Sequence, residues 1–248
     1  GRMIDAKTKN TIEGMLVRCQ FKALCDTYFD VKFNWVIKGT SVLSGTYEDK
    51  ELFFDKVIGR LNDVVQNNWK MHLLGTYIDN DVMIIEMKGE VKAKSGADYN
   101  NDYCWIFRFQ EGKVVNLTAY YDSLLVDKTL AENERLFVYV KHYLKPEGIQ
   151  YIDHTWFPKV KAIMQKIPGY IGFTHDTKLD KKDCVNFTVA FQSKAALDAW
   201  IVHPEHRVVD DLDSYRSRAY WEAVQSRDGV IDRETLSWVA IPSVNAGA

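Results

Sequence analysis

The chain has 248 residues, 46% of them hydrophobic, with 32 basic and 34 acidic side chains. This length predicts two domains, and the near-neutral charge makes nucleic acid and anionic membranes poor partners. No stretch approaches the roughly 18 apolar residues of a membrane span, and the first residues lack the apolar core of a signal peptide.

The sequence carries no recognisable cofactor motif. Cys19, Cys25, Cys104 and Cys184 lie in apolar surroundings without CxxC or zinc-ligand spacing. We therefore expect reduced, buried thiols in a cytoplasmic protein. No GxGxxG follows a strand and no Walker A or GxSxG sequence occurs, so we expect no metal, flavin or other cofactor.

The first half begins with helical patterns and continues with strands. Apolar spacing predicts one or two short helices at 12–29 and a longer amphipathic helix at 48–65. The strands before residue 100 are expected at 33–37, 69–77 and 82–94. Helices followed by a meander of long strands predict one curved sheet wrapped around a helix, with a pocket inside the curve.

The next stretch, 103–126, alternates with period two on both sides of Glu111-Gly112, the pattern of an antiparallel hairpin. If Gln110 pairs with Lys113, one face combines aromatic walls, three polar groups and a carboxylate. That face would hold Tyr103, Trp105, Phe107, Phe109, Val114, Asn116, Thr118, Tyr120 and Asp122. Such a face is typical of a lined pocket, although a one-residue slip would send every side chain to the other side.

The run GxxYxNxYxxxFRFxxGKV, from Gly96 to Val114, is followed by YxD at Tyr120-Tyr121-Asp122. Together with 39–47 upstream, it resembles the SnoaL-like group of the nuclear transport factor two superfamily, over roughly 12–130. Members of that group that are polyketide cyclases, isomerases or hydrolases place an acid/base aspartate in a cone-shaped pocket. The resemblance implies that Asp122 is the matching residue.

Asp122 is therefore the first candidate catalytic residue, with a pKa that an aromatic wall would raise. Tyr103 or Tyr120 would donate a hydrogen bond to a developing enolate oxygen. The alternative is that Asp122 only caps the turn after its strand. Further candidates for the lining of this pocket are Trp35, Trp69, His72, Asn101, Trp105 and Asn116.

After a polar segment at 131–134, expected to be a linker, the pattern restarts in the order βαββαβ, which is ferredoxin-like. The strands are expected at 137–144, 169–179, 185–191 and 219–224, and the helices at 147–167, at 193–200 and from Pro204. Pro146 just before the first helix and Ser193 as the cap of the second support these positions.

The sequences IPGYIGF at 167–173 and FTVAFQSKAALDAWIVHPEHRVV at 187–209 resemble the antibiotic biosynthesis monooxygenase family, over about 136–226. The resemblance implies a cavity lined by Trp200 and His206, with His206 as a candidate catalytic residue. The alternative is that His206 lies on the surface. His154 lies off the apolar stripe of its helix and is a further candidate. His203 and His206 have no third ligand nearby, so a metal site is not expected.

We therefore predict an α+β protein with a SnoaL-like domain at 1–130, a ferredoxin-like monooxygenase-type domain at 131–228 and a tail at 229–248. The expected function is a cofactor-independent enzyme that acts on an aromatic or polyketide-like substrate, by proton transfer in the first domain and oxygenation in the second. The alternative is a catalytically silent binding or dimerisation protein. Because two helices cover only one face of a ferredoxin-like sheet, we expect a homodimer paired through the other face, unless the tail or the first domain covers it.

Overall fold

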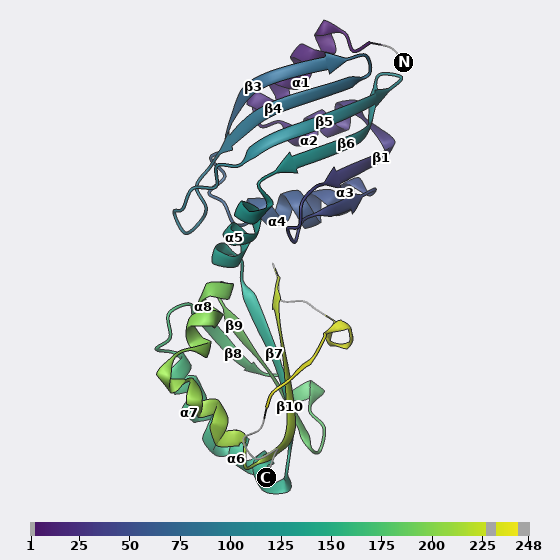
Figure 1. Ribbon diagram of the computed structural model, residues 1–248. Coiled ribbons are helices and arrows are strands. Elements are labelled where there is room, and N and C mark those ends of the chain that lie inside the picture. The colour runs from purple at the N-terminus through teal and green to yellow at the C-terminus, as the bar shows by residue number, and fades with distance from the viewer. Residues whose placement is uncertain (1–2, 227–231, 243–248) are drawn as a thin grey trace. The chain divides into compact units, whose positions relative to one another are not determined.

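The computed structural model describes residues 3–226 and 232–242, and the chain divides into two units, Gly1–Asn133 and Glu134–Ala248 (Figure 1). Each unit has one β-sheet with helices against one face, so the chain is of the α+β class. Parts of the expected tail, residues 229–231 and 243–248, lie outside the described residues.

The first unit contains the predicted helices and strands, together with a short strand, β2, and a helix, α5, that the sequence did not predict. The helical elements are α1 (Ala6–Val17), α2 (Phe21–Tyr28), α3 (Lys50–Phe53), the π-helical turn η1 (Phe54–Gly59), α4 (Arg60–Asn62) and α5 (Ser123–Asn133). The strands are β1 (Phe29–Ile37), β2 (Gly45–Tyr47), β3 (Lys70–Asp79), β4 (Val82–Glu90), β5 (Asp102–Gln110) and β6 (Lys113–Tyr121). The expected linker is wrong, since residues 131–133 are the last residues of α5.

The six strands form one sheet in the order β2-β1-β6-β5-β4-β3, with β1 parallel to β6 and the other neighbours antiparallel. Helices α1 to α4 lie against one face of the sheet, which curves around them (Figure 1). Ile12 and Leu24 from the helices join Met83 and Ile85 of β4 in a dry core. Burial of such side chains is the main force that holds helices on a sheet.

The hairpin between β5 and β6 confirms the predicted turn but not the register beyond it. Glu111 and Gly112 adopt positive φ angles of 51° and 77°, and Gln110 lies opposite Lys113. The pairing then shifts by one residue, because Phe109 faces Val114 while Arg108 faces Asn116. Val115 is thus the extra residue of a β-bulge.

The bulge exchanges the two faces of β6 relative to the prediction. Phe107 lies opposite Leu117, Trp105 opposite Ala119, and Tyr103 opposite Tyr121. The expected partners of these aromatic residues were Asn116, Thr118 and Tyr120, which lie on the other face of the sheet. The physical reason is the period of two, which carries every residue after an insertion to the opposite side.

The strands and helices of the second unit follow the order that the sequence predicted. Its strands are β7 (Leu136–Leu144), β8 (Tyr170–His175), β9 (Cys184–Phe191), β10 (Arg216–Gln225) and β11 (Val239–Ala240). The helices are α6 (Pro146–Tyr151), the π-helical turn η2 (Ile152–Trp156), α7 (Phe157–Met164) and α8 (Lys194–Ile201), with 3₁₀ turns η3 (Thr177–Leu179), η4 (Pro204–Leu212) and η5 (Arg233–Thr235). Ser193 Oγ accepts a hydrogen bond from Ala196 N and so caps α8 as expected.

These strands form an antiparallel sheet in the order β11-β10-β7-β9-β8. Helices α6, α7 and α8 cover one face, where Trp156 and Leu197 pack against Val140 and Phe187 (Figure 1). The core of this unit lies between that face and the helices.

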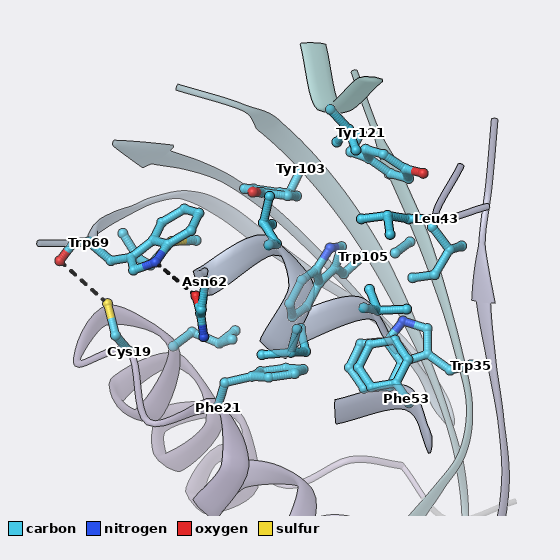
Figure 2. Close-up of a pocket in the computed structure, with 18 of the residues that line it drawn as sticks. Cys19, Phe21, Trp35, Leu43, Phe53, Asn62, Trp69, Tyr103, Trp105 and Tyr121 are labelled. Carbon is cyan, nitrogen blue, oxygen red and sulfur yellow. Dashed lines mark hydrogen bonds between the residues drawn. The ribbon is translucent and has the colours of Figure 1, made fainter. Parts of the chain in front are cut away.

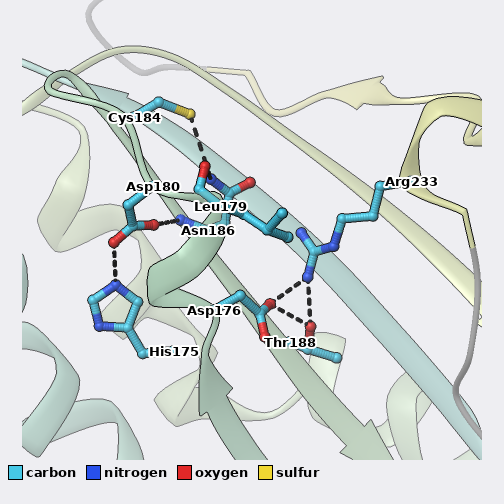
Figure 3. Close-up of polar contacts among 8 residues, drawn as sticks. All are labelled: His175, Asp176, Leu179, Asp180, Cys184, Asn186, Thr188 and Arg233. Carbon is cyan, nitrogen blue, oxygen red and sulfur yellow. Dashed lines mark hydrogen bonds and ion pairs between the residues drawn. The ribbon is translucent and has the colours of Figure 1, made fainter.

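The other face of this sheet, here called the outer face, is partly covered by residues 232–242. Arg233 forms an ion pair with Asp176 and donates a 2.8 Å hydrogen bond to Thr188 Oγ1 (Figure 3). Its guanidinium carbon also lies 5.0 Å from the centre of the Tyr139 ring. Tyr139 is only 4% exposed. The chain therefore supplies its own cover for part of the face through which we expected dimer formation.

Candidate functional site

The first unit contains an apolar cavity of about 210 Å³ between its helices and the sheet (Figure 2). Four of the predicted lining residues are present: Trp35, Trp69, Tyr103 and Trp105. Phe21, Phe53, Tyr99 and Tyr121 complete the aromatic wall. A dry apolar cavity of about 150 Å³ in another protein accommodates benzene, so this one is large enough for a small aromatic molecule.

Ring contacts fix the shape of this wall. Trp35 of β1 stacks on Phe53 of α3 with ring centres 3.7 Å apart, and it meets Trp105 of β5 edge to face with ring centres 6.1 Å apart. Phe21 of α2 contacts Trp105 at 5.3 Å. Because these rings come from separate elements, the cavity is held by the fold rather than by one loop.

Several hydrogen-bonding groups belong to residues of this wall. The Trp35 Nε1 donor is buried and has no hydrogen-bond partner among the described residues. The Tyr121 hydroxyl lies 2.7 Å from Ser41 Oγ and 3.1 Å from Ser44 Oγ, within the loop after β1. Burial raises the pKa of Tyr99 to about 12 and that of Tyr103 well above the usual tyrosine value. These two phenols therefore stay protonated at neutral pH.

The residues that line this cavity include no Asp, Glu, His, Lys or Arg among those the structure describes. Asp122, the predicted acid/base, is exposed at the end of β6. Its Oδ1 accepts a 3.1 Å hydrogen bond from Leu125 N and caps the start of α5. The buried Asn101 holds the Asp122 backbone on both sides, accepting from its N at 2.8 Å and donating to its O at 3.1 Å. The contacts of Asp122 are thus those of the capping alternative.

The remaining first-unit candidates also lie away from the cavity wall. Tyr120 is 46% exposed and pairs with Cys104 on the face that the bulge turns outward. Asn116 accepts a 3.0 Å hydrogen bond from Thr118 on that same face. His72 is exposed on β3, with Nε2 2.9 Å from Glu90 Oε2. The expectation that Asp122 and Tyr120 share one pocket with Trp105 is therefore wrong.

The second unit has its own cavity, of about 240 Å³, between its helices and the inner face of its sheet. Both residues expected there, Trp200 and His206, line it. The rest of the wall is apolar except for one further histidine, His142. This pocket thus joins an aromatic wall to titratable nitrogen atoms, a combination that the first cavity lacks.

His206 lies in the η4 turn with its ring 5.0 Å from the Trp200 ring, edge to face. Burial lowers the pKa of His206, although Asp210 nearby acts in the opposite direction. The imidazole is therefore neutral at pH 7 and can accept a proton.

His142 was not singled out by the sequence reasoning. It lies on β7, is 1% exposed, and stacks on Phe187 with ring centres 5.6 Å apart. Burial lowers its pKa to about 3, with a further contribution from Arg216. A signal was present in the sequence, since the alternation of β7 puts residue 142 on the same face as Val138 and Val140.

The other histidine contacts of this unit lie outside its cavity wall. His154 is exposed on η2. His175 Nε2 lies 2.6 Å from Asp180 Oδ2, and Asp180 Oδ1 accepts from Asn186 N at 2.7 Å (Figure 3). Neither His154 nor the His175–Asp180 pair is among the residues that line the cavity.

The described residues include neither a cluster of metal ligands nor a membrane-spanning helix. Residues 3–226 and 232–242 contain no group of three or more His, Cys, Asp or Glu side chains placed to hold a metal ion. Within those same ranges, no helix has the length and apolar character needed to cross a membrane. Of the four cysteines, Cys25 and Cys184 are buried, whereas Cys19 is exposed, contrary to the expectation of four buried thiols.

No protein-family model and no curated protein matches the chain. Solved structures resemble about half of it. A protein from a soil-derived mobile gene cassette is 21% identical over 50% of this chain and 94% of its own, with a TM-score of 0.43. An NTF2-like protein from Burkholderia thailandensis is 18% identical over 47% and 89%, with a TM-score of 0.41. A protein provisionally named a SnoaL-like polyketide cyclase, from Jannaschia sp., is 10% identical over 51% and 94%, with a TM-score of 0.42.

Proposed function

We propose that the protein is a cofactor-independent enzyme that acts on a small aromatic molecule, and that its chemistry takes place in the second-unit cavity. The observation that carries this proposal is the half-buried His206 against Trp200 in an apolar pocket. A neutral imidazole in such surroundings is a suitable general base near pH 7.

The substrate class follows from the chemistry of that pocket. An apolar aromatic wall favours a flat, uncharged ring system, and the base needs a weakly acidic proton to remove. A phenol or quinol provides both. Loss of its proton to His206 gives an electron-rich anion that reduces molecular oxygen and bonds to it through a ring carbon, forming a hydroperoxide. Loss of water from the hydroperoxide leaves a quinone, so one oxygen atom enters the product and the other leaves as water.

The arrangement of the second unit agrees with this reading. Its strand order β10-β7-β9-β8, with two helical connections on one face, supports a ferredoxin-like fold of the monooxygenase type. The extra strand β11 at the edge of β10 is an addition to that pattern.

For the first unit, we propose binding of a neutral aromatic or polyketide-like molecule with a carbonyl or ether oxygen. The unpartnered Trp35 Nε1 is a donor that suits such an oxygen. An isomerase or cyclase reaction here would need a base, and none is present among the described lining residues. The catalytically silent alternative is therefore the one favoured for this cavity.

The test is oxygen consumption by the full chain with a panel of hydroquinones and naphthols, in buffer without added metal or cofactor. We expect His206→Gln to lower kcat by at least about 100-fold, the usual loss for a general base. His154→Gln makes the same change at an exposed position and should have parental activity. Equal activity of the two variants would reject His206 as the base.

A further inference from the structure

One buried polar atom of the second unit has no partner within the described protein. His142 Nδ1 is buried and makes no hydrogen bond to any described residue. An unmet buried polar group destabilises the folded state, so structures rarely keep one without a reason. The His142 ring also forms part of the cavity wall, so a molecule bound there lies against it.

The surroundings of His142 hold its ring in place. Phe187 stacks on one side of the His142 ring at an interplanar angle of 10°. The centre of the Trp156 ring lies 6.3 Å from the centre of the His142 ring. Trp156 is fixed in turn by a 2.8 Å hydrogen bond from its Nε1 to Val208 O, in the turn that also carries His206. A ring clamped in this way presents its nitrogen atoms in one orientation.

The identity of the matching ligand group follows from the neutral state of this histidine. Burial and the nearby Arg216 both oppose its protonation, so one ring nitrogen carries a hydrogen and the other accepts. A hydroxyl group can satisfy Nδ1 in either tautomer, because it both donates and accepts. A carbonyl oxygen could meet only one tautomer, and a bare hydrocarbon could meet neither.

We propose that His142 binds the hydroxyl group of the aromatic substrate in the second-unit cavity and so selects hydroxylated rings over unsubstituted ones. This inference rests on the proposed function of that cavity and adds a second polar contact to it. In this arrangement His142 is a binding residue that sets specificity, while proton removal stays with His206.

The experiment compares 1-naphthol with naphthalene, which differ only in the hydroxyl group. Binding to the full chain is followed by NMR of ¹³C-methyl methionine. Met164 is the one methionine in the sequence after residue 133 and lines the second-unit cavity, whereas Met71 lines the first. The two signals therefore report separately on the two cavities.

Two variants separate the hydrogen bond from the shape of the ring. His142→Phe keeps a flat ring and removes both nitrogens, while His142→Asn places an amide group near the position of Nδ1. In the parent protein we expect 1-naphthol to bind at Met164 about 10-fold more tightly than naphthalene, as one net hydrogen bond allows. We expect His142→Phe to abolish that preference and His142→Asn to retain most of it.

Two results would overturn the inference: an unchanged preference in His142→Phe, or no preference in the parent protein. A different result would reject the proposed function: oxygen consumption by His206→Gln at the parental rate. If His206→Gln is inactive and His142→Phe keeps the preference for 1-naphthol, the enzyme assignment stands and the role of His142 does not. The Met164 signal of each variant without ligand shows whether the second unit is folded.

Discussion

The burial of His142 should make the second unit sensitive to acid. In the unfolded chain this histidine takes up a proton below its ordinary pKa of about 6.5, whereas in the folded protein it does so only near pH 3. The unfolded state therefore binds more protons between these values. Its contribution to stability is complete above pH 6.5 and is lost as the pH falls toward 3.

We expect the free energy of unfolding of the second unit to fall by about 2 kcal/mol between pH 6.5 and pH 5 because of His142. Urea titrations at the two pH values, followed through the Met164 methyl signal, measure this change. His142→Phe should lose most of the pH dependence and keep or improve the stability at pH 7, since it removes an unmet polar group. A parental pH dependence in that variant would contradict the prediction.

Substitution of Asp122 should affect stability rather than catalysis, because its side chain caps α5. Asp122→Ala should lower the stability of the first unit by about 1 kcal/mol through loss of the α5 cap. Asp122→Asn is the matched control, because asparagine caps as well as aspartate and yet cannot act as a base. Urea unfolding measures both variants. A large loss of turnover in Asp122→Asn, with stability unchanged, would restore the catalytic hypothesis.

At the scale of elements, the β5–β6 hairpin carries strain at one position of its turn. Glu111 has a φ of 51°, a conformation that asparagine and glycine adopt more readily than glutamate. Glu111→Asn should therefore stabilise the first unit by about 1 kcal/mol. Gly112→Ala, at a φ of 77°, should destabilise it by a similar amount. Unfolding midpoints in urea at equal m-values test the pair, and a destabilised Glu111→Asn would show that the side chain of Glu111 has another role.

The same hairpin shows where sequence reasoning stops. The turn at Glu111-Gly112 and the pairing of Phe109 with Val114 follow from the alternating pattern, and both are confirmed. The bulge could not be predicted, since Val115 and its neighbours alternate well enough in either register. Trp35 and Trp105 were assigned to the cavity correctly because they lie on β1 and β5, whose faces do not depend on the register of β6. Tyr121 could be found only with the bulge in place.

In the second unit, strands and helices were predicted well because their apolar periods and caps are regular. His206 was found through the resemblance of segment 187–209 to the monooxygenase family. His142 was missed because a histidine on an apolar strand face usually belongs to the core. Only the structure places its ring against a cavity and leaves Nδ1 without a partner.

At the scale of the whole molecule, the outer face of the second sheet decides between monomer and dimer. Residues 232–242 contact that face through the ion pair of Arg233 with Asp176 and through Trp238, whose ring lies 4.2 Å from Lys141 Nζ. These contacts favour the alternative in which the tail takes the place of a partner sheet. The homodimer expected from the sequence is untested, and the tail contacts predict a monomer in its place.

We expect the full chain to sediment at micromolar concentration near its own mass of 28.7 kDa. Removal of residues 227–248 should raise the average mass, since Tyr139 and its neighbours would lose their cover. Arg233→Glu should act in the same direction by repelling Asp176, whereas Arg233→Lys should retain the ion pair. A dimer of the full chain that none of these changes affects would show that pairing uses another surface.

The bulge at Val115 also has an evolutionary meaning. Because Val115 is the unpaired residue, loss of that one codon would leave Leu117 opposite Phe107 and Ala119 opposite Trp105. The apolar wall would therefore survive the deletion, whereas the loss of any paired residue of β6 would turn the following side chains to the other face. Descendants of one gene can thus shorten this strand at a single position without changing the side chains that meet the ligand.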